Sequence, residues 1–290
     1  MENLVYHYTT LDALRGILKE DALCLWATHY KHLNDPSEQI WAERNIIKSI
    51  QETDLSYKAD SHNNMKLWLG KETYIISLCQ KRDYRNMWRL YGGDGKGVCL
   101  GLNKRKIRNL SRKNSVSDPD NKIDIFRKVD YSSLNTIDDV VRKVINDKAF
   151  DVFDVFDEDE ANTIMRIAPF IKNDDFRIED EIRYARIRDM KCIKFSYDPV
   201  TEGPSEPSRT ENLNGVKYRM RGDERIPYIE IPFPTEILEE IILGYEVDEK
   251  ETKEYINSLI SPFREKYNKK LNVSPSDLYS NKNRLDYETN

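Results

Sequence analysis

The chain has 290 residues, of which 39% are hydrophobic and 33% are charged, and its net charge is −5. These values are typical of a globular protein with one large domain or two small ones. They give no general sign of nucleic-acid binding. Because the sequence has neither a long apolar run nor a signal-peptide pattern, we expect a cytoplasmic protein without membrane contact.

Cysteine and histidine usage gives no metal signal. The cysteines are Cys24, Cys79, Cys99 and Cys192. They are far apart and form no CxxC pair, so neither a zinc ribbon nor a redox dithiol is indicated. His29 and His32 lie close together, but no carboxylate or cysteine stands beside them at ligand spacing. We therefore expect no metal cofactor.

The hydrophobic pattern predicts short strands that alternate irregularly with helices. Strands are expected at 4–9, 22–27, 74–79, 98–102, within 122–131, and at 181–187, 228–233 and 240–243. Helices are expected at 11–18, 36–50 and 84–91, over most of 137–171, and from 249 toward 260. Thr10, Asp83 and Asp248 stand in capping positions, and residues 35–38 form a capping box.

The intervals between strands are too irregular for a doubly wound fold, so we expect an α+β protein with a mixed, mainly antiparallel sheet. A single domain at 1–275 should contain a helical insertion at about 135–172 and a proline-bearing mobile loop at about 198–226. An extended tail is expected at 276–290. The segment Gly92 to Gly97 fits neither phosphate-loop motif, because a strand and not a helix follows it, so we expect a turn there.

The tripeptide His7-Tyr8-Thr9 closes the first predicted strand. Side chains alternate along a strand, so His7 and Thr9 should face one side, and Tyr8 the other. A histidine beside a threonine at a strand end suits the binding of a sugar hydroxyl or a phosphate. The alternative is a buried structural histidine.

Two later segments carry the other residues that such a pocket needs. The first supplies Ser77, Trp88 and Tyr91, and the second supplies Glu179, Glu181 and Arg183, which share one face of an extended strand. Aromatic rings with carboxylates that stabilise positive charge suit the breaking of a glycosidic bond. Core packing of the rings and a plain ion pair between Glu181 and Arg183 are the alternatives.

Several motifs, in order, resemble those of a bacterial family. They are Tyr6-His7-Tyr8-Thr9, Leu33-Asn34-Asp35-Pro36-x-Glu38, the Ser77 strand, Met87-Trp88-x-x-Tyr91-Gly92, Lys96-Gly97-Val98, Glu179-x-Glu181-x-Arg183 and Ile241-Ile242-Leu243-Gly244. The family is catalogued as domain of unknown function 2971, and its members occur among phage-defence genes. The resemblance runs from about Tyr6 to about Gly244. Asn34 and Glu38 either line the pocket or serve the helix cap alone.

The order of a His-Tyr-Thr strand, a central strand and a late Glu strand also resembles the mono-ADP-ribosyltransferase fold. The resemblance implies NAD as co-substrate. It implies that His7 holds a ribose of NAD and that Thr9 assists. Tyr8, which stands between them, belongs to the same NAD-binding segment. It further implies that Tyr91 or Trp88 stacks on nicotinamide, that Glu181 or Glu179 is the catalytic carboxylate, and that Arg183 holds a phosphate or pairs with Glu181. Ser77 occupies the position at which mono-ADP-ribosyltransferases have an aromatic residue on the second strand of their catalytic triad.

The leading hypothesis is therefore an NAD-using, toxin-like effector in phage defence that transfers ADP-ribose to nucleic acid or protein, or cleaves NAD. A basic cluster is the expected nucleic-acid contact, and it comprises Lys104, Arg105, Lys106, Arg108, Arg112 and Lys113. A protein partner from a defence system is a further expectation. The alternative is a non-catalytic module that senses a nucleotide or nucleic acid and signals to a partner. A nuclease is favoured least, because no spaced D…ExK motif is present.

Overall fold

The structure, a computed structural model, describes residues 3–34, 41–42, 45, 72–117, 123–132, 168–188, 197–198, 203–204, 215–261 and 271–278. Several expectations lie outside these residues. They concern the site candidate Glu38 with the capping box at 35–38, the helix that follows it, Cys192, most of the insertion at 135–172, most of the loop at 198–226, and the tail beyond 278.

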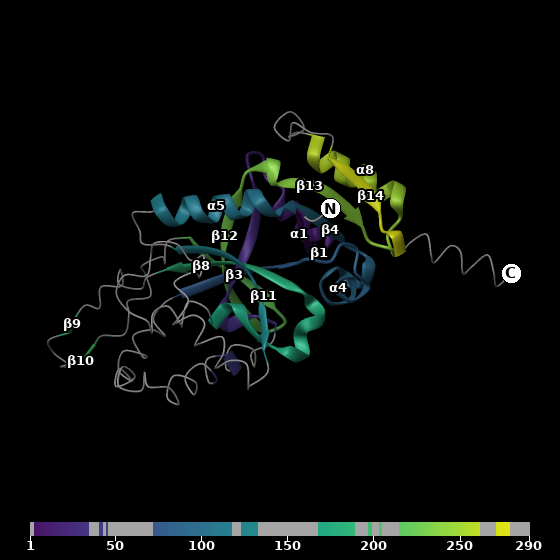
Figure 1. Ribbon diagram of the computed structural model, residues 1–290. Coiled ribbons are helices and arrows are strands. Elements are labelled where there is room, and N and C mark those ends of the chain that lie inside the picture. Colours follow the sequence, from purple (N-terminus) through teal and green to yellow (C-terminus); the bar gives the residue numbers. More distant parts are fainter. Residues whose placement is uncertain are drawn as a thin grey trace.

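A ten-stranded sheet forms the centre of the molecule (Figure 1). Its main path runs through β11 (Val216–Arg221), β12 (Glu224–Phe233), β2 (Leu23–His29), β3 (Glu72–Cys79), β1 (Leu4–Thr9), β4 (Val98–Asn103), β13 (Leu238–Leu243) and β14 (Asn272–Pro275). Off this path, β8 (Glu181–Arg188) pairs with β3 and with β5 (Ile123–Lys128). In this sheet only the β13–β14 pairing is parallel among the described strands, so the expected mainly antiparallel α+β fold is confirmed.

Helices α1 (Leu11–Ile17), α5 (Lys104–Ser117) and α8 (Glu249–Ile260) cover one face of the sheet (Figure 1). Their apolar residues, such as Leu14, Ile107 and Ile256, join the largest core cluster. The predicted caps are confirmed at two helices. The Thr10 side chain accepts a hydrogen bond from the amide of Ala13, and Asp248 accepts one from the amide of Glu251.

Helix α4 (Arg85–Tyr91) covers the opposite face with a smaller core. There Tyr6 and Tyr8 pack with Met87 and Trp88, so the expected alternation of side chains along β1 is present. Asp83 does not cap α4 as expected, since no side chain caps this helix. Its Oδ1 instead accepts a hydrogen bond of 2.7 Å from Nε1 of Trp88.

The sheet forks at β3, and this fork positions the candidate site. Strand β8 pairs with one edge of β3 along its whole length, from Glu72 to Cys79. Because a strand has only two edges, β1 and β2 share the other edge. Strand β2 pairs there at Tyr74 and Ile75, and β1 pairs at Cys79. On that edge residues 76–78 therefore face no described strand, and Ser77 lies at the centre of the fork.

Two short pieces complete the surroundings of β8. Strands β6 (Asp130–Ser132) and β7 (Ile171–Asn173) form a parallel pair. In the chain, β7 stands between the 3-10 helix η4 (Ala168–Phe170) and the 3-10 helix η5 (Asp174–Glu179). Residue Ile171 is thus in a strand, whereas the hydrophobic pattern predicts helix as far as this residue. The strand pair β9 (Tyr197–Asp198) and β10 (Gly203–Pro204) lies apart from the main sheet.

Part of the expected loop at 198–226 is in fact a hairpin of the main sheet. Strands β11 and β12 pair from Val216 to Arg221, with a turn at Gly222. The strand was missed because β11 lies at the sheet edge and its residues from Lys217 to Met220 are exposed, so it lacks the apolar alternation of a half-buried strand. Among the described residues, no helix has the length and apolar character needed to cross a membrane.

Candidate functional site

His7 and Ser77 meet at the fork between β1 and β2. Nδ1 of His7 lies 3.4 Å from the carbonyl oxygen of Ser77, at the part of the β3 edge that none of the described strands covers. The Ser77 side chain is exposed, and His7 is half-buried. The fork is therefore open to solvent at the point where the two residues meet, as a ligand site requires.

Ser77 also contacts the carboxylate of Glu181 on the next strand. The register of β3 and β8 pairs Ser77 with Arg183 and Cys79 with Glu181, so these four side chains face the same side of the sheet. The Ser77 hydroxyl donates a hydrogen bond to the Glu181 carboxylate. Ser77 thus links the histidine of β1 to the acid of β8 through its carbonyl group and its hydroxyl group.

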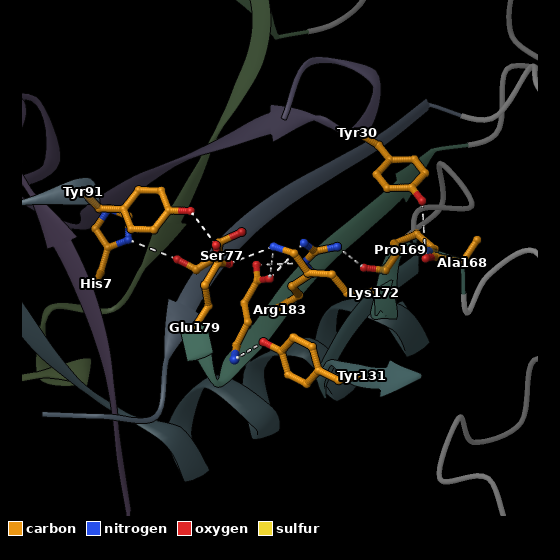
Figure 2. A network of polar contacts seen from close by, with 11 residues as sticks. His7, Tyr30, Ser77, Tyr91, Tyr131, Ala168, Pro169, Lys172, Glu179 and Arg183 are labelled. Atoms are coloured by element: carbon orange, nitrogen blue, oxygen red, sulfur yellow. Dashed lines mark hydrogen bonds and ion pairs between the residues drawn. The ribbon is translucent and has the colours of Figure 1, made fainter. Parts of the chain in front are cut away.

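Glu181 is held firmly by Arg183. Nε and Nη2 of Arg183 donate to Oε1 and Oε2 of Glu181 at 2.8 Å and 2.9 Å, while Nη1 donates to the carbonyl oxygen of Pro169 at 2.6 Å (Figure 2). The backbone amide of Glu181 donates to the hydroxyl of Tyr131 at 2.8 Å. Both charged side chains are buried, so this pairing fixes the orientation of the carboxylate.

Lys172 joins the two acids into one cluster. From β7, its Nζ lies 2.7 Å from Oε2 of Glu179 and 3.5 Å from Oε2 of Glu181. Lys172 is 4% exposed, which is unusual for a lysine and is explained by its two carboxylate partners. Within this buried cluster, the two positive charges of Lys172 and Arg183 balance the two negative charges of Glu179 and Glu181.

The pKa of Glu181 follows from these contacts. Burial opposes ionisation of its carboxyl group, but the charges of Arg183 and Lys172 and the hydrogen bonds from Arg183 and Ser77 outweigh this effect. Together they lower the pKa from 4.5 to about 2. Glu181 is therefore an ionised and immobile carboxylate at neutral pH.

Tyr91 connects the acid cluster to the β11–β12 hairpin. Its hydroxyl donates to Oε1 of Glu179 at 3.3 Å and also hydrogen-bonds with the side chain of Asn34. Oδ1 of Asn34 accepts from Nη1 of Arg221 at 3.1 Å. Burial and the charge of Glu179 raise the pKa of Tyr91, so its hydroxyl stays protonated and able to donate. Figure 2 shows Tyr91 and His7 with the acid cluster.

His7 has a neutral ring at neutral pH. Burial lowers its pKa below 6.5, and the nearby charge of Arg219 acts in the same direction, while the Ser77 carbonyl opposes both. A carbonyl oxygen only accepts hydrogen bonds, so Nδ1 carries the ring proton when it bonds to Ser77. Nε2 then holds a free electron pair and can accept a hydrogen bond from a ligand hydroxyl.

The structure brings together His7, Ser77, Tyr91, Glu179, Glu181 and Arg183, and it adds Asn34 through Tyr91. Three other candidates are in the core. Trp88 is fully buried, Tyr8 is 5% exposed and Thr9 is 7% exposed. The Tyr8 hydroxyl donates to the carbonyl oxygen of Lys81 at 2.9 Å. Of the two rings considered for stacking on a ligand, Trp88 is fully buried, and Tyr91 lies beside Glu179.

Sequence reasoning missed Lys172 and Tyr131. Lys172 and Tyr131 belong to the short strands β7 and β6, which have no clear hydrophobic pattern. A lysine directly after the apolar residues 168–171 was the one available signal for Lys172. Among the described residues, no group of three or more potential metal ligands occurs.

The predicted basic cluster lies on α5. Its first residue, Lys104, reaches toward the site, because Nζ of Lys104 contacts Oε1 of Gln80 at 3.4 Å. Gln80 follows β3, and its side chain donates to Asp180, which separates the two acids in sequence, at 2.9 Å. The start of α5 therefore lies near Asp180, which connects Glu179 at the end of η5 to Glu181 at the start of β8.

The fold and the fork define an α+β protein with a polar cluster at the branch point of a mainly antiparallel sheet. In comparisons with known proteins, the family described as "Protein of unknown function (DUF2971)" matches residues 87–184. This stretch runs from α4 to β8 and includes Trp88, Tyr91, Glu179, Glu181 and Arg183. The match supports the family resemblance over that part of the chain. Searches of curated proteins and of solved structures found no match.

Proposed function

We propose that this protein is an NAD-using enzyme of the ADP-ribosyltransferase type, which transfers ADP-ribose to an acceptor or to water. The observation that carries the proposal is the double contact of Ser77 with the His7 ring at 3.4 Å and with the Glu181 carboxylate. An imidazole from the first strand and an acid from a late strand thereby lie at one solvent-open fork.

The proposed reaction breaks the bond between nicotinamide and C1′ of its ribose. The electron pair of this bond leaves with nicotinamide, and the ribose becomes an oxocarbenium-like cation. An acceptor oxygen or nitrogen, or water, then attacks C1′ and loses its proton. Fixed negative charge beside the cation lowers the barrier, because the carboxylates need no reorganisation when the charge develops.

The contacts favour different roles for the two acids. Both oxygens of Glu181 are engaged by Arg183, so Glu181 supplies fixed charge and positions its neighbours. Oε1 of Glu179 accepts only the longer hydrogen bond of 3.3 Å from Tyr91 among the described contacts. We assign to Glu179 the contact with a ribose hydroxyl, and to Nε2 of His7 a second hydroxyl of the ligand.

The proposed acceptor is a nucleic acid bound at the start of α5. Lys104 lies beside the turn between the two acids, and Arg105 and Arg108 are exposed on the same helix. Such a helix attracts phosphate groups, and the attraction weakens with salt. A role as an effector in phage defence, suggested by the family resemblance, is part of the proposal. Expression should then be toxic to cells, and Glu181→Gln should relieve the toxicity.

A second candidate function is a non-catalytic nucleotide sensor. It is favoured by the charge balance of the buried cluster, in which Lys172 and Arg183 neutralise both acids. A sensor would keep ligand binding at His7 but show no turnover. Ligand binding that persists in Glu181→Gln, without chemistry in the wild type, would favour the sensor.

The test is nicotinamide release from NAD, with water, protein and single-stranded nucleic acid offered as acceptors. We expect turnover by the wild type and losses of at least about tenfold in His7→Ala, Glu179→Gln and Glu181→Gln. Glu249→Gln on α8 is the matched control and should keep full activity, since its partner Lys253 lies on the same surface helix. Thermal unfolding shows whether each variant is folded. No turnover and no NAD binding by the wild type would remove the proposal.

A further inference from the structure

Arg219 on β11 faces the same side of the sheet as Ser77. Its Nη2 donates to Oγ1 of Thr28 at 3.0 Å. Thr28 pairs with Ile75 in the register of β2 and β3, so Thr28 and Ser77 lie on one face. The guanidinium group of Arg219 thus lies over β2, the strand on the other side of the fork from β1 and His7.

Arg219 differs from the other charged residues of its strand. Lys217 pairs with Glu230 at 2.7 Å, and Arg221 pairs with Glu224 at 2.9 Å. Among the described residues, the contacts of Arg219 are the neutral Thr28 hydroxyl and the Trp26 ring, whose centroid lies 5.9 Å from the guanidinium carbon. No described carboxylate contacts Arg219.

The Arg219 side chain is exposed, and its positive charge acts on His7 at the fork. Partial burial and the neighbouring charge of Arg221 lower the pKa of Arg219, and the charge of Arg219 in turn helps to lower the pKa of His7. A cation whose described contacts include no carboxylate attracts an anionic ligand. A guanidinium group forms paired hydrogen bonds with phosphate oxygens, and the Thr28 hydroxyl supplies a further polar contact.

We propose that Arg219, with Thr28, binds the diphosphate of the nucleotide whose ribose is held at His7 and Glu179. This inference rests on the proposed function, because it places the phosphate groups of that same ligand. It divides the fork into two arms. The ribose that reacts lies on the β1 side, between His7 and Glu179, and the diphosphate lies over β2, β12 and β11.

The experiment measures binding of ADP-ribose and of adenosine, which lacks phosphate, to the full chain by calorimetry. Arg219→Gln should weaken ADP-ribose binding by at least about tenfold, the effect of losing a charge-assisted hydrogen bond. It should leave adenosine binding unchanged. Arg219→Lys should keep more affinity for ADP-ribose than Arg219→Gln, because the positive charge remains.

Arg225→Gln is the matched control. Arg225 is exposed on the same hairpin, but it pairs with Met220 and therefore faces the side of the sheet opposite to Arg219. Its guanidinium carbon lies 3.9 Å from the centroid of the Tyr218 ring. This variant removes the same charge and should bind ADP-ribose as the wild type does.

The outcomes separate the two proposals. A wild type that binds NAD, with equal ADP-ribose affinities in Arg219→Gln and Arg225→Gln, overturns the diphosphate site and leaves the proposed function intact. A wild type that binds neither NAD nor ADP-ribose overturns both. If Arg219→Gln weakens binding of a single-stranded oligonucleotide but not of ADP-ribose, Arg219 serves a nucleic-acid backbone, and the inference is wrong.

Discussion

Glu181 and Arg183 are two residues apart on β8 and hold each other through two hydrogen bonds of 2.8 Å and 2.9 Å on one face of the sheet. Their side chains are 5% and 1% exposed, so neither charge is solvated by bulk water. The pair fixes the acid that Ser77 contacts. It also ties β8 to η4 through the carbonyl group of Pro169.

Removal of Arg183 should therefore destabilise the fold strongly. Arg183→Met leaves the Glu181 carboxylate without its main partner in a buried place, and we expect a loss of about 3–5 kcal/mol in the free energy of unfolding. The control is Arg177→Met, which breaks the exposed pair with Asp174 and should cost at most about 1 kcal/mol. Urea denaturation measures both. Equal losses in the two variants would contradict a structural role for the buried pair.

The stability of the protein should fall in acid through Glu181. Its pKa is about 2 in the folded state and near 4.5 when the chain is unfolded. The unfolded state therefore takes up a proton between about pH 4.5 and pH 2 that the folded state does not, and the stability gained from ionisation is lost over this range. Glu181→Gln should flatten this part of the pH profile of the free energy of unfolding. An unchanged profile in Glu181→Gln would rule out the lowered pKa.

His7 should remain neutral below pH 6.5, with its proton on Nδ1. Burial disfavours the charged ring, and the carbonyl oxygen of Ser77 selects the tautomer. NMR of the ring nitrogens during a pH titration measures both properties. Ligand binding through Nε2 should hold from pH 8 to pH 6.5 and weaken only below the lowered pKa. A ring that titrates above pH 6.5 would exclude the assigned role of Nε2 as an acceptor.

The glycine-rich turn should tolerate no side chain where it meets β1. A Cβ atom on Gly97 would lie 2.1 Å from the carbonyl oxygen of Thr9, so Gly97→Ala must displace backbone and should cost several times as much stability as Gly215→Ala. Gly215 has no neighbour within 4 Å of a Cβ, and only its positive φ opposes alanine, at about 1 kcal/mol. Comparison of the two unfolding midpoints tests this difference. Similar unfolding midpoints in the two variants would show that the backbone around Gly97 accommodates a Cβ atom, and would contradict the prediction.

The sequence predicts the strands that alternate or are wholly apolar, and it misses those that tertiary contacts create. Strands β1, β2, β3, β4, β8 and β13 follow from their apolar patterns. Strand β11 has exposed residues from Lys217 to Met220 and forms only because β12 offers an edge. Spacing also suggests that Glu181 and Arg183 share a face, but the branch at Ser77 depends on pairings between distant strands, which no local pattern encodes.

The candidate site shows the same division. The sequence alone proposes His7, Glu179 and Glu181, because a histidine suits the binding of a sugar hydroxyl and carboxylates suit the stabilisation of positive charge. Lys172 is recognised only from the structure, in which β7 places its Nζ 2.7 Å from Oε2 of Glu179. Trp88 has the right residue type for stacking but is fully buried against Tyr8 and Tyr245. Residue type alone does not distinguish a ring that faces a ligand from one that fills the core.

The most direct test of the account is the affinity of the full chain for NAD, measured by calorimetry on the wild type, His7→Ala, Glu179→Gln and the double variant. If both side chains hold one ribose at the fork, the wild type binds NAD, each single change weakens binding by about tenfold, and the double change costs less than the sum of the two free-energy losses. An NAD affinity that neither change alters would show that the fork at Ser77 is not the nucleotide site.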